Sequence, residues 1–184
     1  DYMSQVYYSV DVMPRSDARV RGELREVRLG QVGISRFCAD QQRVFRYAEA
    51  AKQDSEENFV FIFPVVENLY FEQRGKSGFV APGGVALLNS SEYYEASCPD
   101  RFENLTLKVP CASLRSRLPG IDDACASFNH VNPAIAKAIL GLASPLLDPD
   151  AVMNNHQKDG IAETIVDLLE LMLNSEPETT EAPH

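Results

Sequence analysis

The hydrophobic pattern of residues 7–107 predicts a succession of short β-strands. Apolar or alternating runs recur there about every ten residues, separated by glycine, proline or polar clusters, as in antiparallel sheet proteins. The clearest run is Asn58–Val66, in which Phe59, Phe61 and Phe63 share one face and Val60 and Ile62 share the other. A strand that is apolar on both faces must be covered on both. Further strands are expected at Gly22–Leu29, Gly33–Ala39, Arg43–Ala48, Leu69–Gln73, Val85–Asn89, Tyr93–Ala96 and Asn104–Val109.

After Pro110 the hydrophobic period changes to that of helices. Ala112–Leu118 fits a short helix, and Pro133–Leu142 places a proline at a helix start. Asp159–Leu173 is strongly amphipathic, because its apolar residues recur at three- and four-residue steps. Monomeric proteins rarely leave such a stripe exposed, so we expect it to form a homodimer interface. The stripe consists of Ile161, Ile165, Leu168, Leu169 and Met172.

These elements predict a mainly β fold with C-terminal α-helices, namely a cupin-like jelly-roll barrel followed by two or three helices. With 184 residues, the chain is long enough for one substantial core. We expect residues 1–110 to form an effector-binding barrel and residues 111–174 a helical dimerisation segment of the same domain. Residues 175–184 contain no large apolar side chain and are expected to be a disordered linker.

The residue types that carry metal and nucleophilic chemistry are scarce. No histidine occurs before His130, so the histidine pair of metal-binding cupins is missing, and neither a metal nor a cofactor is expected. The four cysteines are irregularly spaced, with no CxxC pair, and are expected to be buried thiols. No phosphate-binding glycine loop is present. We therefore expect a protein that binds rather than an enzyme.

Charge and hydropathy limit the kinds of partner that this chain can bind. The net charge of −10 makes DNA binding by this chain alone unfavourable, yet residues 15–46 hold eight arginines against four acids. An anionic ligand would therefore belong near the first half. No run of eighteen apolar residues occurs and the start lacks a signal-peptide pattern, so a cytoplasmic protein without membrane contact is expected.

Residues 69–120 resemble the AraC-binding-like domains that precede the helix-turn-helix half of AraC-family transcription regulators. The order of motifs carries the resemblance: Arg74-Gly75, Pro82-Gly83, Asn89-Ser90-Ser91 before Tyr93 and Tyr94, Val109-Pro110, and Arg117-Leu118-Pro119-Gly120. Gly75 and Gly83 also suit turns that need a positive φ. Residues 22–50 look like the first strands of the same family, whereas Gly84 stands where the family usually has an acid.

The resemblance implies a small effector bound inside or at the mouth of the barrel, a homodimer, and DNA binding only through a C-terminal domain that this chain does not include. Two alternatives stay open. One is a metal-free cupin-fold enzyme such as an isomerase, and the other is a dimerisation domain without a ligand.

Several side chains are candidates for contact with that ligand. Arg36 shares a face with Ile34 and Cys38, and points either into the barrel or outward on a distorted strand. Arg46 is a further candidate, although we expect it on the surface. Aromatic strand residues can line a pocket or simply fill the core. They are Phe61, Phe63, Tyr70 and Tyr93.

Arg15 and Arg19 form an RxxxR spacing that resembles the first motif of PilZ-type cyclic di-GMP receptors. Asn89 and Ser91 resemble the start of the second motif, although Tyr94 stands where that motif has glycine. Guanidinium groups bind phosphates and stack on purines, so a cyclic di-GMP-like nucleotide is the sharpest form of the anionic-ligand hypothesis. The alternative is a solvated arginine loop.

Overall fold

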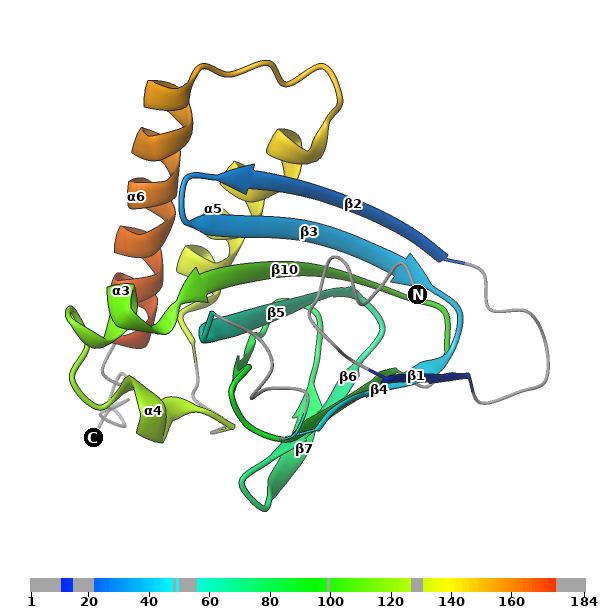
Figure 1. Cartoon of the computed structure of the whole chain (residues 1–184). Coiled ribbons are helices and arrows are strands. Elements are labelled where there is room, and N and C mark those ends of the chain that lie inside the picture. Colours follow the sequence, from blue (N-terminus) through cyan, green and yellow to red (C-terminus); the bar gives the residue numbers. More distant parts are fainter. Residues whose placement is uncertain are drawn as a thin grey trace, which may run out of the picture.

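The computed structural model describes residues 11–14, 22–47, 49, 56–98, 100–126 and 131–174. Ten strands form two five-stranded antiparallel sheets that face each other (Figure 1). Sheet A has the order β1 (Asp11–Pro14), β4 (Gln42–Arg46), β9 (Tyr94–Cys98), β6 (Leu69–Gln73) and β7 (Lys76–Val80). Sheet B has the order β2 (Gly22–Leu29), β3 (Val32–Ala39), β10 (Phe102–Pro110), β5 (Asn58–Val66) and β8 (Ala86–Asn89). The predicted barrel followed by helices is confirmed.

The strand predicted with two apolar faces lies between two cores. Phe59, Phe61 and Phe63 of β5 are fully buried in the core between sheet B and the helices. Val60 and Ile62 are buried in the core between the two sheets. The pattern predicted β5 correctly because alternate side chains of a strand point to opposite faces.

The turn glycines adopt the conformations expected of them. Gly75 has φ 70° in the tight turn between β6 and β7, and Gly83 has φ 94°. The pattern missed β1 and β7, which lie at the two edges of sheet A. Edge strands are short and half-exposed, so they lack a long apolar run.

The helices follow β10. They are α3 (Cys111–Arg115), α4 (Ile121–Ala124), α5 (Pro133–Ala143), the 3₁₀ turn η1 (Ser144–Leu147) and α6 (Asn155–Leu173). Asn132 accepts a hydrogen bond from the Ala134 amide at the start of α5, and Asn154 with Gln157 forms a capping box at the start of α6. In Figure 1, α5 and α6 stand across one end of sheet B, on its side away from sheet A.

The apolar stripe of α6 packs inside this chain. Ile165, Leu169 and Met172 are at most 2% exposed and belong to the core under sheet B, while Ile161 and Leu168 are partly buried against it. The expectation that the whole stripe faces a second subunit is therefore wrong for those three residues. These side chains pack against sheet B of the same chain, because the phenylalanine and leucine side chains of sheet B face the helices.

Candidate functional site

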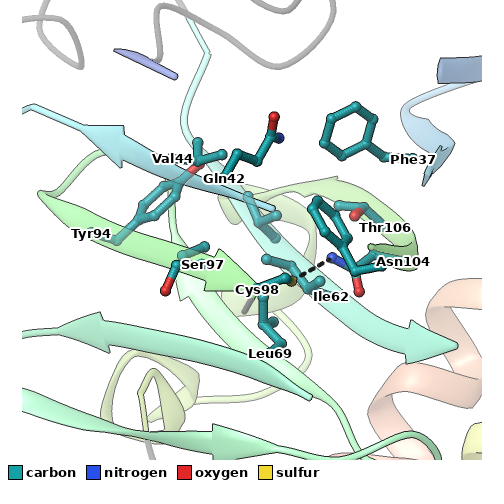
Figure 2. Close-up of a pocket in the computed structure, with 13 residues that line it drawn as sticks. Phe37, Gln42, Val44, Ile62, Leu69, Tyr94, Ser97, Cys98, Asn104 and Thr106 are labelled. Carbon is teal, nitrogen blue, oxygen red and sulfur yellow. Dashed lines mark hydrogen bonds between the residues drawn. The ribbon is translucent and has the colours of Figure 1, made fainter. Parts of the chain in front are cut away.

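A cavity of about 60 Å³ lies between the two sheets, beside the first part of β10 and so at the end of the barrel away from α3, which follows β10. One water molecule needs roughly 10–15 Å³ of cavity volume. The cavity therefore has room for several waters or for a small organic molecule. Its walls come from strands of both sheets, as Figure 2 shows. The lining residues are Phe37, Gln42, Val44, Val60, Ile62, Leu69, Tyr94, Ala96, Ser97, Cys98, Phe102, Asn104 and Thr106.

Most of this wall is apolar. Val60 and Ile62 cover it from β5, and Phe37 packs edge-on against Phe102 with ring centroids 5.4 Å apart. Phe37 is only half-buried, whereas Phe102 is buried. An apolar wall with a few polar groups is the usual lining of a small-molecule site.

Two buried amides interrupt the apolar wall. Gln42 is 2% exposed and Asn104 is 6% exposed. Within the described residues, the Gln42 Nε2 donor and the Asn104 Oδ1 acceptor have no hydrogen-bond partner. Among the described residues, the other end of the Asn104 amide makes a long contact, 4.0 Å from Nδ2 to the Cys98 sulfur, drawn in Figure 2. Leaving such groups unpaired costs about 1–3 kcal/mol each, so the site has unused hydrogen-bonding capacity.

The cavity is electrically neutral. No lysine or arginine lies among its lining residues as described. Burial raises the pKa of the Cys98 thiol to about 12, so the sulfur stays protonated at neutral pH. A charged ligand would therefore lose its hydration here without gaining a counter-charge from these residues.

The opposite end of the barrel is closed by a buried polar network, and Arg46 is part of it. Arg46 is 1% exposed, and its Nε donates to the Ser90 carbonyl at 3.0 Å. The expectation of a surface position for Arg46 is therefore wrong. The residue sits on the inner face of β4 together with Gln42 and Val44, where a guanidinium is stable only if it is hydrogen-bonded.

Asn89 and Ser91 build the loop at this closed end. The Asn89 Oδ1 accepts from the Ser91 amide at 2.9 Å and from the Ser91 hydroxyl at 2.7 Å. The Asn89 Nδ2 donates to Asp122 Oδ1 at 3.3 Å. The resemblance of Asn89 and Ser91 to a nucleotide-binding motif therefore coincides with a structural turn.

The remaining candidates lie outside the barrel. Arg36 is exposed and pairs with Glu103 at 2.6 Å, so the inward alternative for it is wrong. The core under the helices covers Ile34 on the same face but does not include Arg36. Tyr93 is 40% exposed and contacts Tyr47 on the outer face of sheet A. Arg15 and Arg19 fall outside the described residues.

The other aromatic pocket candidates also have different neighbours. Phe61 and Phe63 pack under the helices, on the face of β5 away from the cavity. Tyr70 pairs with Phe79, with ring centroids 5.3 Å apart. None of these three side chains lines the cavity between the sheets.

Sequence reasoning missed Gln42 because the predicted strand began at Arg43, one residue after it, and it missed Asn104 because this residue lies on a face that looks solvent-exposed. Along β10, Asn104 and Thr106 alternate with Leu105 and Leu107. In a sheet with one wet face this pattern puts the polar residues outside. Here helices cover the leucine face, so the polar face becomes the barrel interior. A signal was present, since a polar strand face opposite a helix-covered face must turn toward the second sheet.

Comparison with known proteins identifies the family. The family model described as AraC-binding-like domain matches residues 1–174. The chain belongs to the AraC-binding-like domain family. The resemblance in the motifs from Arg74 to Gly120 is thereby confirmed.

Relatives of this AraC-binding-like domain include a transcriptional activator. The transcriptional activator NphR of a Rhodococcus species is 26% identical over 142 residues, which cover 76% of this chain and 42% of NphR. An uncharacterised protein encoded in the nit 5′ region of Bacillus sp. strain OxB-1 is 23% identical over 95% of this chain and 68% of its own length. The chain therefore spans less than half of NphR.

The fold has a solved counterpart. The crystal structure of the AraC-like transcriptional activator CuxR superposes with a TM-score of 0.74 at 14% identity, covering 98% of this chain and 66% of CuxR. At this identity the match shows the fold alone. Over the residues that the structure describes, no cluster of three or more histidine, cysteine or acidic side chains could hold a metal, and no helix is long and apolar enough to cross a membrane.

Proposed function

We propose that this domain senses a small effector in its barrel and controls a transcription regulator of which it is a part. The observation that carries the proposal is the cavity between the sheets, with two buried amides whose hydrogen-bonding capacity is unused among the described residues. A core selected only for stability would replace such amides with apolar side chains. Membership of the AraC-binding-like domains and similarity to a transcriptional activator support the regulatory role.

The action is binding rather than catalysis. The described cavity residues include no histidine or carboxylate, and its cysteine is held protonated by burial. A metal-free enzyme would need an acid and a base inside the barrel. The alternative of an isomerase therefore lacks a base among these residues, although Tyr94 is present as a hydroxyl group.

A route from the barrel to α6 runs through charged contacts at its closed end. Asp122 of α4 receives hydrogen bonds from Asn89 at 3.3 Å and from Arg115 Nε at 2.8 Å. Arg117, just after α3, pairs with Asp167, Glu163 and Glu170 of α6. Effector binding would act by changing the relative stability of two arrangements of these elements. DNA binding would belong to a further domain of the regulator.

The test is a thermal-shift screen of small metabolites against three forms of the chain. Ala96→Leu fills the cavity, and Ala138→Leu makes the same change on the exposed face of α5. Effectors of the barrel should raise the melting temperature of the native chain and of Ala138→Leu, but not that of Ala96→Leu. A compound that stabilises all three forms equally binds elsewhere, and the absence of any cavity-dependent compound in a broad library would refute effector sensing in the barrel.

We propose in addition that the regulator is a homodimer, with the outer side of α6 at the interface. Ile161 and Leu168 are only partly buried within the chain, and Leu171 is 56% exposed beside them. These three residues follow steps of seven and three along the helix, which places them on one side. Light scattering of the native chain tests the dimer directly.

The anionic-ligand hypothesis concerns a different site. The cavity has no described cation, and Asn89 and Ser91 are engaged with each other and with Asp122. A cyclic di-GMP-like nucleotide would therefore depend on Arg15 and Arg19. Calorimetry with cyclic di-GMP checks this, since Arg15→Ala and Arg19→Ala should each weaken binding by about 1.5 kcal/mol or more. Undetectable binding of cyclic di-GMP to the native chain would refute the hypothesis of a nucleotide ligand.

A further inference from the structure

We infer that the barrel selects a small neutral molecule with an apolar body that carries both a hydrogen-bond acceptor and a hydrogen-bond donor, read by Gln42 and Asn104 respectively. This inference rests on the proposed effector site and names the chemistry of its ligand. Carboxamides and lactams are the simplest members of the class. They supply an acceptor and a donor in one uncharged group.

The position of the two amides supports selection rather than chance. Gln42 is the first residue of β4 in sheet A, and Asn104 lies near the start of β10 in sheet B. They therefore reach the same cavity from opposite sheets. Each is fixed by a buried strand backbone, because Gln42 pairs in register with Cys98 and Asn104 with Phe37. A ligand between them meets preorganised polar groups whose ordering cost has already been met in folding.

The other lining residues determine the chemical character of the part of the ligand that does not contact the two amides. Val44, Val60, Ile62 and Leu69 offer only hydrocarbon, whereas Tyr94, Ser97 and Thr106 add hydroxyl groups elsewhere in the lining. A polar group placed against the hydrocarbon would lose its hydration without a partner. The ligand therefore turns a short hydrocarbon or ring toward these four apolar side chains, and the cavity of about 60 Å³ limits it to a few heavy atoms.

Charge excludes the nearest competitors. A carboxylate and a carboxamide have almost the same shape, but the carboxylate is charged and has no N–H donor. With no lysine or arginine among the described lining residues, a buried carboxylate would lack a counter-ion. A ketone of the same shape can accept from Gln42 but has nothing to donate to Asn104. These differences make three molecules of matched size a direct probe of the site.

The experiment titrates the native chain, labelled with ¹⁵N, with butyramide, 2-pentanone and butyrate. The side-chain NH₂ signals of Gln42 and Asn104 report the site itself, and their loss in Gln42→Leu and Asn104→Leu assigns them. We expect butyramide to shift both signals and to bind about tenfold more tightly than 2-pentanone, since the ketone leaves Asn104 unpaired. Butyrate should leave both signals unchanged.

The variants separate the two roles. Asn104→Leu should abolish the preference for butyramide over 2-pentanone, because it removes the acceptor that only the amide uses. Gln42→Leu should weaken both ligands, because both use its donor. Gln31→Leu makes the same change in an exposed turn and should leave every affinity unchanged. Both cavity variants should keep or raise the melting temperature of the free protein, since each replaces an unpaired buried amide with an apolar side chain of similar size.

The titration tests the ligand class, whereas the thermal-shift screen with Ala96→Leu tests effector sensing in the barrel. Equal binding of ketone and amide, or tightest binding of butyrate, would leave the barrel as an effector site but overturn the ligand class. A marked loss of melting temperature in both cavity variants would show that the amides serve the fold and would also overturn it. If none of the three molecules shifts the Gln42 signal, the inference is refuted, and the Ala96→Leu screen then decides the proposed function independently.

Discussion

Gln73 and Asn89 bind each other through two buried hydrogen bonds that run in opposite directions. The Gln73 Nε2 donates to the Asn89 carbonyl at 2.8 Å, and the Asn89 amide donates to the Gln73 Oε1 at 2.9 Å. Both residues are at most 1% exposed. A side-chain amide thus takes the place of a neighbouring strand at the end of β8, where the Asn89 side chain also donates to Asp122 of α4 at 3.3 Å.

Gln73→Leu should lower the free energy of unfolding by about 1–3 kcal/mol, because it leaves the buried Asn89 N–H without a partner and its carbonyl with only the long 3.4 Å contact from the Glu92 amide. Urea denaturation followed by circular dichroism measures the change. Gln31→Leu is the matched control in an exposed turn, and it should stay within about 0.5 kcal/mol of the native chain. Equal effects of the two substitutions would contradict the role given to Gln73.

Asp122 should make part of the stability depend on pH. Hydrogen bonds from Arg115 hold the pKa of Asp122 below its usual value. The folded state therefore binds this proton less readily than the unfolded chain, so the contribution is present above the unfolded pKa of about 3.9 and is lost as pH falls through the lower folded pKa.

Asp122→Asn should accordingly lower stability by less than about 1 kcal/mol at pH 7, because the side chain is partly exposed and solvent screens it. The difference from the native chain should shrink as the pH falls below about 4. Thermal melts across pH 2.5–7 test this, with Asp123→Asn at the next, exposed position as the control. A difference that grows on acidification would have the wrong sign.

Arg117 should fix the last turns of α6. Its guanidinium contacts Asp167 and lies 3.6 Å from Glu163 and 3.5 Å from Glu170. Arg117→Met leaves these three acids to repel one another, so the melting temperature should fall slightly at low salt and recover as salt rises. Hydrogen exchange should become faster in residues 167–173 and stay unchanged in β5. Uniform faster exchange throughout the domain would mean that Arg117 serves general stability instead.

Two leucines of α6 should respond differently to the same substitution. Leu169 is fully buried, so Leu169→Glu should destabilise the domain by several kcal/mol through an unpaired buried charge. Leu171 is 56% exposed, so Leu171→Glu should keep the melting temperature of the fold but dissociate a dimer formed through the outer side of α6. Light scattering combined with thermal melts separates these effects. A dimer that survives Leu171→Glu would place the interface elsewhere.

Three of the four free thiols should be unreactive in the native protein. Burial raises the pKa of Cys98, Cys111 and Cys125 to about 12, so at pH 8 only about one in ten thousand of each is a thiolate. Cys38 is only partly buried. A thiol reagent should therefore modify one cysteine per folded chain quickly and all four in urea, and Cys38→Ser should remove the fast reaction. Fast modification of Cys98 would show that the cavity opens widely.

Local patterns determined most of the secondary structure of this protein. The alternation of Phe59, Phe61 and Phe63 with Val60 and Ile62 already required a strand covered on both faces, because side chains of a strand alternate strictly. Pro133 and the apolar spacing of residues 159–173 similarly predicted the two long helices. These features depend on residues a few positions apart, so the sequence by itself is sufficient to specify them.

Only the tertiary structure decided which face of each strand is inside the barrel. Arg36 and Arg46 both follow apolar alternation, yet Arg36 is exposed on an outer face and Arg46 lies inside. The packing of distant segments likewise buries Gln42 and Asn104 inside the barrel, and it buries most of the α6 stripe against sheet B of the same chain. The physical reason is that burial depends on what covers a face, and that cover comes from segments far away in the chain, just as Ile165 of α6 belongs to the core that buries the phenylalanine face of β5.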